Sequence, residues 1–391
     1  MPVVFTDLEE LKFRLLTEGI VIAPDAERAW RERFRGPLTL AEYATTSGVS
    51  LVLGTKLYVN APLDGAASSV LTIDGDDFVV SRGDDAWPAT VVPVPGYHDW
   101  VQHDLVEGDD QPYTNYGVTH TDRVRVSPIG GCAWKCKFCD LPYETGYRKK
   151  HQDNLLAVIV AAAMDEQVPA RHVLVSGGTP RAPMPARPGR PASDDEASID
   201  AVYEYLAAHS PLPVDVMLPP RRDVKHAERL SAMGVNMVSI NLEIYDGARV
   251  RALAPAKAKV GAQHTLDYIE RAVEAFGVGN VQSLVVLGAA IEPVESTLAA
   301  VKQLAERGCI PVLSPFRPHS ATPLRHSPPA SLDEVLYAYG RAHEICDAVG
   351  TGVRPGPRCI ACQHNTATVP DGSDFYISPD GPFPTRASRT S

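Results

Sequence analysis

From Arg123 onward, short apolar runs typical of buried strands alternate with longer stretches that carry a helical pattern. Six such pairs follow one another, and their strand-like runs read VRVSPI, HVLVSG, VDVML, VNMVSINL, VQSLVVLG and IPVLSPF. Parallel strands need crossover connections, usually helices, so the alternation predicts a parallel sheet that is buried on both faces. The fold class predicted is α/β, with a partial or complete parallel β/α (TIM-like) barrel. Its chemistry is expected on loops that follow the carboxyl ends of the strands.

The helices of this barrel are expected at residues 154–165, 198–210, 223–233, 294–307 and 332–349, with further helices inside 244–276. A Pro-rich tract at residues 180–198 interrupts the alternation after the second strand. Such a composition predicts a surface insertion that serves as a loop or a mobile lid.

The chain divides into three parts by pattern. Residues 1–115 predict a small α+β N-terminal region of unknown role, in which Asp74-Gly75 suits a hairpin turn. Residues 116–350 hold the barrel, and residues 351–391 form a Pro/Gly-rich tail that contains a C-x2-C pair. In the N-terminal region, helices are expected at 7–17, 25–34 and 40–46, and strands at 51–59, 69–73, 78–81 and 89–94.

Composition narrows the class of protein. The 391 residues carry a net charge of −11, which argues against a protein whose main role is to bind a phosphate backbone. The sequence has neither a long apolar run nor a secretory signal, so a cytoplasmic location without membrane contact is expected. Seven cysteines are too few for a secreted disulfide scaffold, and their clustering indicates metal binding.

Three cysteines follow the first predicted barrel strand directly. Cys132, Cys136 and Cys139 have the spacing C-x3-C-x2-C. Three thiolates can hold a [4Fe–4S] cluster by three irons and leave the fourth iron open to another ligand. A structural zinc site wants four ligands, and the nearest further candidate, His151, lies twelve residues away. The spacing therefore favours a reactive iron–sulfur cluster.

The stretch CAWKCKFC resembles the signature of the radical S-adenosylmethionine (SAM) superfamily, with Phe138 in its aromatic position. The resemblance spans about residues 122–349 and is nearest to biotin synthase. It implies that the open iron binds SAM, and that one electron cleaves SAM to methionine and a 5′-deoxyadenosyl radical. The cofactors implied are a [4Fe–4S] cluster and SAM, with an electron donor such as flavodoxin or ferredoxin.

The same resemblance assigns further residues to SAM, each near the end of a predicted strand. Those matched to the elements around the amino group, the ribose and the adenine are Gly177, Gly178, Thr179, Asn241, Glu243, Gly288 and Glu292. One of the two cations that follow, Arg251 or Lys257, would pair with the SAM carboxylate. Arg317 and His319, in the segment LSPFRPHSATPL, would face the barrel mouth as candidate catalytic residues. The alternative explanation is an ordinary turn for Gly177 to Thr179, an exposed strand-end residue for Glu243, solvated helix charge for Arg251 and Lys257, and an exposed polar side chain for Arg317 and for His319.

A second group of cysteines lies near the C-terminus. Cys346, Cys359 and Cys362, with His364 nearby and Cys309 as a further candidate, could hold an auxiliary iron–sulfur cluster or a zinc ion. Cys346 lies in a helical pattern, however, where a buried thiol is the ordinary explanation.

These observations predict a radical SAM enzyme that abstracts hydrogen from a small-molecule substrate, in a biosynthetic pathway. Two alternatives stay open. One is radical SAM modification of an RNA or a peptide, against which the acidic balance counts. The other is a non-catalytic iron–sulfur or zinc protein.

Overall fold

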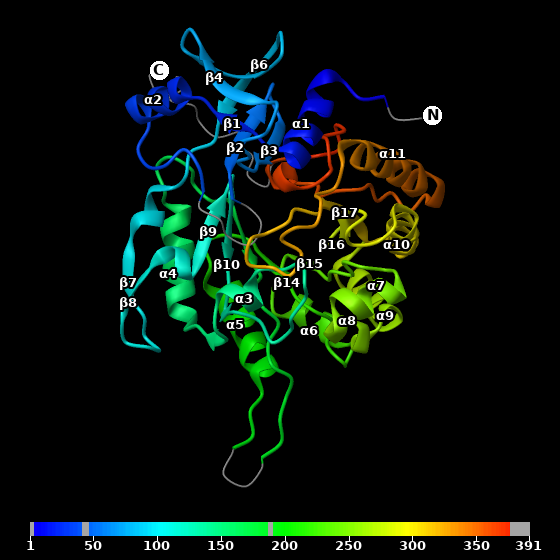
Figure 1. Cartoon of the computed structure of the whole chain (residues 1–391). Helices are drawn as coiled ribbons and strands as arrows, with labels where there is room; N and C mark the ends of the chain where they lie inside the picture. Colours follow the sequence, from blue (N-terminus) through cyan, green and yellow to red (C-terminus); the bar gives the residue numbers. More distant parts are fainter. Residues whose placement is uncertain (1–3, 41–46, 187–190, 376–391) are drawn as a thin grey trace.

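The computed structural model describes residues 4–40, 47–186 and 191–375 (Figure 1). Its main sheet has seven strands in the order β17-β16-β15-β14-β13-β10-β9. The strands are β9 (Gly117–His120), β10 (Arg123–Val126), β13 (His172–Val175), β14 (Val214–Met217), β15 (Met237–Ser239), β16 (Val281–Leu287) and β17 (Ile310–Pro315).

Six strands of this sheet are parallel and follow chain order, and only β9 runs antiparallel, to β10. The six predicted strand runs are thereby confirmed. The sheet is open, because β17 and β9 form its two edges and do not pair with each other within the described residues. The barrel is therefore a partial one.

Helices connect the parallel strands, as crossover connections must. They are α4 (Gln152–Ala163), α5 (Asp195–His209), α6 (His226–Ala232), α7 (Gly247–Leu253), α8 (Pro255–Val260), α9 (Ala262–Phe276) and α10 (Val294–Glu306), and a further helix, α11 (Leu332–Val349), follows the last strand. The helix α9 illustrates why these segments are helical. Its buried residues include Leu266, Ile269 and Ala272, whose spacing places them on one face, towards the sheet. Expected helices and observed ones agree within a few residues at each end.

The N-terminal region contains α1 (Asp7–Glu18) and α2 (Pro24–Arg33) beside a six-stranded sheet. Its strands are β1 (Val21–Ile22), β2 (Val49–Leu53), β3 (Leu57–Ala61), β4 (Val70–Asp74), β5 (Asp77–Arg82) and β6 (Asp85–Val91). The single strand expected at 51–59 is a hairpin of β2 and β3, since the chain turns at Gly54 with a φ of 58°. The expected turn at Asp74-Gly75 joins β4 to β5. The helix expected at 40–46 lies, apart from Leu40, outside the described residues.

Short elements complete the chain between the two sheets, between β10 and α4, and after α11. They are η1 (Gly96–Asp99), β7 (Val101–His103), β8 (Asp110–Pro112), η2 (Tyr113–Asn115), β11 (Ile129–Gly130), α3 (Leu141–Glu144), β12 (Arg148–Lys149) and η3 (Ala361–Asn365).

The N-terminal region shares its hydrophobic core with the last part of the barrel. Phe13 of α1 packs in one cluster with Leu313 of β17 and Tyr339 of α11, and the rings of Phe13 and Tyr339 lie 5.3 Å apart. The region also contacts the opposite edge of the open sheet, where the hydroxyls of Tyr97 and Thr119 are 2.8 Å apart. It thus packs against both edges of the partial barrel (Figure 1).

The segment after α11 runs along the free edge of β17. The amide of Gly356 donates to the carbonyl of Pro311 at 2.8 Å, and the amide of Ala367 donates to that of Leu313 at 2.9 Å. These bonds satisfy backbone groups that an edge strand would otherwise expose.

The Pro-rich insertion leaves the body of the molecule as a two-armed loop (Figure 1). Its arms are joined where Met184 and Ser193 exchange backbone hydrogen bonds of 2.8 and 3.1 Å. None of the helices in the described ranges combines the length and apolar character that a membrane crossing requires.

Candidate active site

The cysteine loop, residues 131–140, lies between β11 and α3, at the carboxyl end of β10 where the sequence placed it. Its far side is docked on the end of α7, since the amide of Lys137 donates to the carbonyl of Leu253 at 2.8 Å. Phe138 packs against an apolar cluster that includes Ile244, Val286 and Phe316. The aromatic position of the motif thus anchors the loop across the ends of three strands.

The sulfur of Cys132 accepts two backbone hydrogen bonds. The amide of Thr179 lies 3.1 Å from it and the amide of Trp134 lies 3.3 Å from it. In return, the amide of Ala133 donates to the carbonyl of Thr179 at 3.0 Å. Two aligned N–H groups stabilise negative charge on sulfur, so this environment suits a thiolate ligand.

Two glycines after β13 permit this close approach. A Cβ on Gly178 would lie 1.8 Å from the carbonyl oxygen of Gly131, and a Cβ on Gly177 would lie 2.0 Å from the hydroxyl of Ser127. Gly177 also has a φ of 127°, which side chains rarely adopt. The absence of side chains at Gly177 and Gly178 therefore allows the end of β13 to contact the cysteine loop. Thr179 binds the loop through its backbone amide and carbonyl.

The other two cysteines are more deeply enclosed. Burial raises the pKa of Cys136 to about 12, with a further contribution from the charge of Glu243. Burial also raises the pKa of Cys139, with the carboxylate of Asp140 acting in the same direction. Binding of a metal would displace both protons, as metal–thiolate sites require.

A cavity of about 230 Å³ opens beside the cysteine loop. Trp134 of the loop lines it, together with Asn241 after β15 and Arg251 and Lys257 of α7 and α8. Most of its remaining lining is apolar. Its position at the carboxyl ends of the strands is where barrels of this class carry their chemistry.

Glu243 and Lys257 form an ion pair at the edge of the cavity, with their charged groups 3.1 Å apart. The ammonium of Lys257 also donates to the carbonyl of Asn241 at 2.8 Å and lies 5.8 Å from the ring centre of Trp134. Glu243 has a φ of 63°, a strained value for a residue with a side chain. Lys257 is therefore committed to protein partners.

Arg251 is in a different position, although it also lines the cavity. Among the residues that the structure describes, no acidic side chain forms an ion pair with it. Of the two cations that the sequence proposed for a carboxylate, Arg251 is the one that the protein leaves available.

Glu292 differs from the expectation that it contacts SAM. It is fully buried, and its carboxylate accepts hydrogen bonds from the amides of Tyr245 and Asp246 at 2.9 and 2.7 Å. The hydroxyls of Ser296 and Thr297 donate to it as well, at 2.9 and 3.2 Å. Both carboxylate oxygens are thus bonded to protein groups, and two of these bonds hold the segment before α7. Because Tyr245 of that segment lines the cavity, Glu292 supports the cavity wall without lining it.

Gly288 keeps the turn after β16 close to the segment after β17. With a φ of 148°, it has little room for a side chain, because a Cβ would lie 3.1 Å from that of Phe316. Its carbonyl accepts from the amides of Ile291 and Glu292. The glycine supports the wall that Glu292 organises.

Arg317 also differs from the expectation. Its guanidinium turns away from the barrel mouth and donates to the carbonyl of Leu16 at 3.1 Å and to that of Asn60 at 2.7 Å. Both partners belong to the N-terminal region, whose role the sequence did not reveal. Arg317 therefore joins the barrel to that region and is not placed for catalysis.

His319 is buried beside the cysteine loop. Its Nδ1 accepts from the amide of Ala321 at 3.2 Å, so Nε2 carries the proton. Nε2 lies 3.8 Å from Asp140, the last residue of the cysteine loop, and 3.9 Å from Glu144 of α3. Sequence reasoning missed these two acids, although Asp140 directly follows the third cysteine.

The second cysteine group separates in space. Cys346 of α11 packs in the hydrophobic core, and Cys309 is buried in another part of that core. Neither joins Cys359 and Cys362, which instead meet Asp122 and His172. His364 also stays apart, since its Nδ1 donates to the carbonyl of Ala361 at 3.0 Å and its ring stacks on that of His120.

Comparison with known proteins supports the interpretation of the cysteine loop. The model of the radical SAM superfamily matches residues 126–301. The chain contains a radical SAM domain. Proteins of this superfamily use a [4Fe–4S] cluster and SAM, which are accordingly the cofactors of the domain.

One curated relative is the bacteriochlorophyllide c C-7(1)-hydroxylase of Chlorobaculum limnaeum, which is 26% identical over 136 residues. The match covers 34% of this chain and 33% of the relative, so the chain spans about a third of that protein's length. The narrower likeness to biotin synthase stays a prediction.

Among solved structures, a radical SAM methyltransferase from Sphaerobacter thermophilus has a TM-score of 0.46 and 17% identity, covering 76% of this chain and 80% of that one. The [FeFe]-hydrogenase maturase HydG has a TM-score of 0.43 and 15% identity, covering 57% of this chain and 49% of that one. At these levels of similarity neither structure indicates the reaction.

Proposed function

We propose that this protein is a radical SAM enzyme that cleaves SAM reductively and abstracts hydrogen from a small-molecule substrate. The observation that carries the proposal is that the cysteine loop lies next to Gly178, Glu243 and the cavity beside Trp134, at the carboxyl ends of the strands. A cluster and the cofactor bound to it need their ligands and a cavity side by side.

The donor set at the loop fits the cluster. Cys132, Cys136 and Cys139 would hold three irons, and the two amides at Cys132 stabilise its thiolate. Once bound, the cluster and SAM supply the reductive cleavage that produces a 5′-deoxyadenosyl radical. The protein supplies position and exclusion of water, while a flavodoxin or ferredoxin would deliver the electron.

Polar groups around the cavity are arranged to hold SAM. The side-chain oxygen of Asn241 accepts from the hydroxyl of Ser239 at 2.8 Å and from the amide of Leu284 at 3.2 Å. Its NH₂ group is therefore the part that can donate to a ribose hydroxyl, and the carboxylate of Glu243 can accept from one. Arg251 is assigned to a carboxylate, because a guanidinium recognises that group with two hydrogen bonds.

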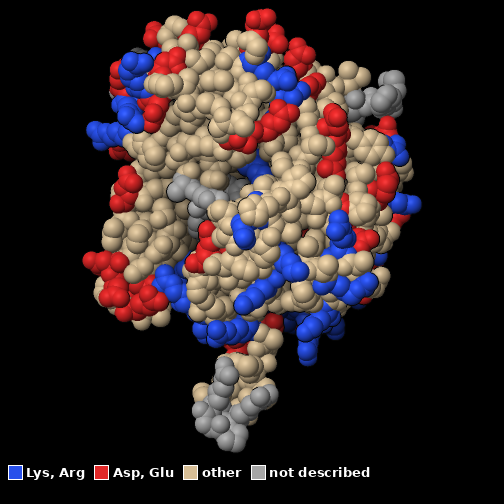
Figure 2. Space-filling model, in the orientation of Figure 1, with Lys and Arg blue, Asp and Glu red and all other residues tan. Residues whose placement is uncertain are grey.

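The substrate is proposed to be a small metabolite with an anionic group. Small-molecule sites are mostly apolar cavities with a few placed polar groups, and the cavity beside Trp134 has this character. Basic side chains gather on the lower part of the face in Figure 2, around α6 to α8, despite the net charge of −11. Such a surface attracts anions to the mouth.

His319 is proposed to move a proton at the mouth. Its protonated Nε2 faces Asp140, whose carboxylate can hold an imidazolium in place.

The test is anaerobic incubation of the reconstituted protein with SAM and dithionite, with 5′-deoxyadenosine measured by chromatography. The wild-type protein is expected to form it, and Cys136→Ala is expected to lose this activity entirely, because a cluster cannot be held by two of its three ligands. Cys309→Ala is the matched control, since it removes a buried thiol outside the site. Activity retained by Cys136→Ala would refute the site assignment.

A further inference from the structure

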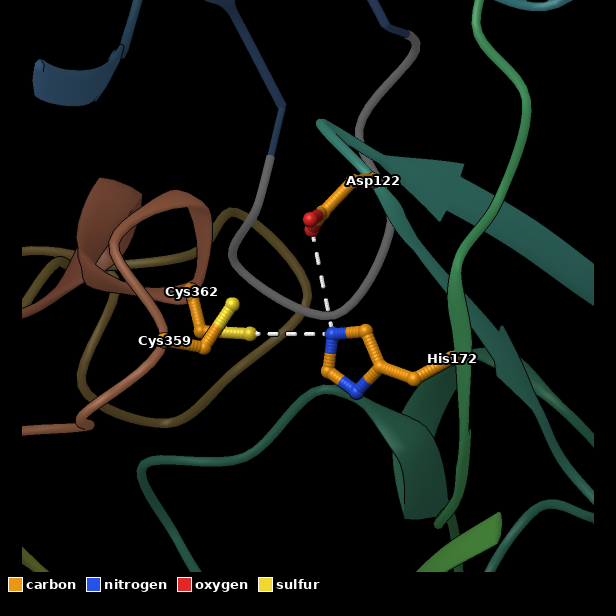
Figure 3. A group of neighbouring side chains, drawn as sticks. All are labelled: Asp122, His172, Cys359 and Cys362. Atoms are coloured by element: carbon orange, nitrogen blue, oxygen red, sulfur yellow. Dashed lines mark hydrogen bonds and ion pairs between the residues drawn. The ribbon is translucent and has the colours of Figure 1, made fainter. Parts of the chain in front are cut away.

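Four metal-binding side chains converge at the end of the sheet that lies away from the cysteine loop (Figure 3). Asp122 directly precedes β10 and His172 is the first residue of β13. Cys359 and Cys362 come from the C-terminal segment, about 190 residues further along the chain. One ligand atom from each lies within 4.8 Å of all the others, and all four residues are buried.

The spacing of these atoms suits a single metal ion. The Nε2 of His172 lies 3.2 Å from the sulfur of Cys362 and 3.7 Å from the nearer carboxylate oxygen of Asp122. Ligand atoms around a tetrahedral zinc ion are separated by about 3.3–3.8 Å, given bond lengths of about 2.0–2.3 Å. The four atoms surround a space for one ion and are too close together for a cluster of several irons.

Asp122 gives an independent indication of a missing partner. The residue is 1% exposed, and neither of its carboxylate oxygens accepts a hydrogen bond within the described part of the chain. A buried carboxylate without such a partner is costly, by several kcal/mol. A cation at this place would remove that cost.

The hydrogen bonds of His172 determine which of its ring nitrogens is free to bind a metal ion between the four side chains. Its Nδ1 lies 3.2 Å from the carboxylate of Asp215, and the amide of Asn236 donates to the other oxygen of that carboxylate at 2.8 Å. Nδ1 therefore carries the proton, and Nε2 offers its lone pair towards the cysteines. A carboxylate behind a histidine in this manner is the usual second layer of a zinc site.

We propose that Asp122, His172, Cys359 and Cys362 bind one Zn²⁺ ion in a structural site. Zinc accepts mixed sulfur, nitrogen and oxygen ligands in tetrahedral geometry, and four protein ligands close its coordination shell. The ligand set differs from the one that the sequence suggested, because Cys346 is replaced by two residues from the barrel.

The site lies where a structural role is expected. Asp122 and His172 stand at the amino ends of their strands, whereas the cysteine loop and Gly177 follow the carboxyl ends. In barrels of this kind the amino ends serve stability. The ion ties the C-terminal segment, already bonded to the edge of β17, to β10 and β13 near the other edge of the open sheet.

The test uses the full chain with Cys132, Cys136 and Cys139 all changed to alanine, so that no metal binds at the cysteine loop. After incubation with Zn²⁺ and gel filtration, about one zinc per chain is expected by mass spectrometry. Adding Cys362→Ser or His172→Asn should abolish the bound zinc. Cys346→Ala is the matched control and should retain it.

Cobalt gives a second measurement that does not depend on these variants folding. Co²⁺ in the same triple-alanine protein should show the absorption bands of a tetrahedral ion with thiolate ligands. The proposal is overturned if no metal is retained, if iron with sulfide is bound, if Cys359 and Cys362 prove to be disulfide-bonded, or if Cys346→Ala loses the zinc. Because the three cysteines of the loop are replaced in this protein, the result is independent of the proposed function.

Discussion

Glu243 combines two unusual properties at the carboxyl end of β15. Its backbone is in the left-handed region, and its carboxylate is paired with Lys257 beside the buried thiol of Cys136. A non-glycine residue in this conformation costs roughly 1 kcal/mol. Strain of this kind persists at functional sites, where another requirement outweighs it.

Changing Glu243 to glycine separates strain from function. Glu243→Gly relieves the backbone, so the melting temperature should not fall, whereas SAM affinity should fall about tenfold as one charge-assisted hydrogen bond is lost. Calorimetric titration of SAM and thermal unfolding measure the two effects. A large loss of stability with unchanged affinity would show that the carboxylate is structural.

Arg251 is expected to bind a carboxylate in the cavity. Arg251→Gln should weaken the binding of SAM or of the substrate about tenfold, since a guanidinium–carboxylate pair is worth more than 1 kcal/mol where water is excluded. Lys259→Gln, on α8 but outside the cavity lining, is the matched control. Equal effects of the two variants would point to general surface charge.

At the scale of elements, the approach of β13 to the cysteine loop decides whether the cluster can form. Gly178→Ala places a methyl group 1.8 Å from the carbonyl oxygen of Gly131, so the loop must move and iron content after reconstitution should drop severely. Gly146→Ala adds the same methyl group near the same loop, with nothing within 4 Å, and should retain its iron. Full iron content in Gly178→Ala would contradict this role.

The sequence predicted those elements whose signals are local. Each parallel strand is an apolar run that ends in a turn, and Cys132, Cys136 and Cys139 lie within eight residues of sequence. Residues that act through distant partners could not be assigned in this way. Asp122 and His172 carry no local sign that they face Cys359 and Cys362.

Arg317 and Glu292 make other contacts than those expected, for the same physical reason. Arg317 was expected at the barrel mouth because its segment ends a strand there, but carbonyls of the N-terminal region bind its guanidinium. Glu292 was expected at the cofactor, yet four donors from its own surroundings satisfy the carboxylate. In both cases the charged group binds partners far away in the sequence, which the sequence pattern does not reveal.

At the scale of the whole molecule, the two ends of the chain meet on the barrel. Lys12 of α1 is fully buried and donates to the carbonyls of Gln363, at 3.0 Å, and Thr368 in the C-terminal segment. Desolvation lowers the pKa of Lys12 from its ordinary value of 10.5 to about 7. Its charge state is therefore linked to folding near neutral pH.

The pH dependence of stability follows from this pKa. Between pH 7 and 10.5 the unfolded chain binds more protons at Lys12 than the folded chain, so the free energy of unfolding rises with pH, by up to about 1.4 kcal/mol per pH unit. Lys12→Met should lack this contribution. Denaturant unfolding of both proteins at pH 7 and 9 measures the difference, and equal pH slopes would contradict the lowered pKa of Lys12.

The proposed function depends on a cluster that three cysteines hold and that SAM can reach through the fourth iron. The most direct measurement is electron paramagnetic resonance of the reduced cluster, with and without SAM, under strictly anaerobic conditions. A signal that changes shape and position when SAM is added is the predicted result. A cluster signal that SAM leaves unchanged, or reconstituted protein that holds zinc at Cys132, Cys136 and Cys139, would contradict the account.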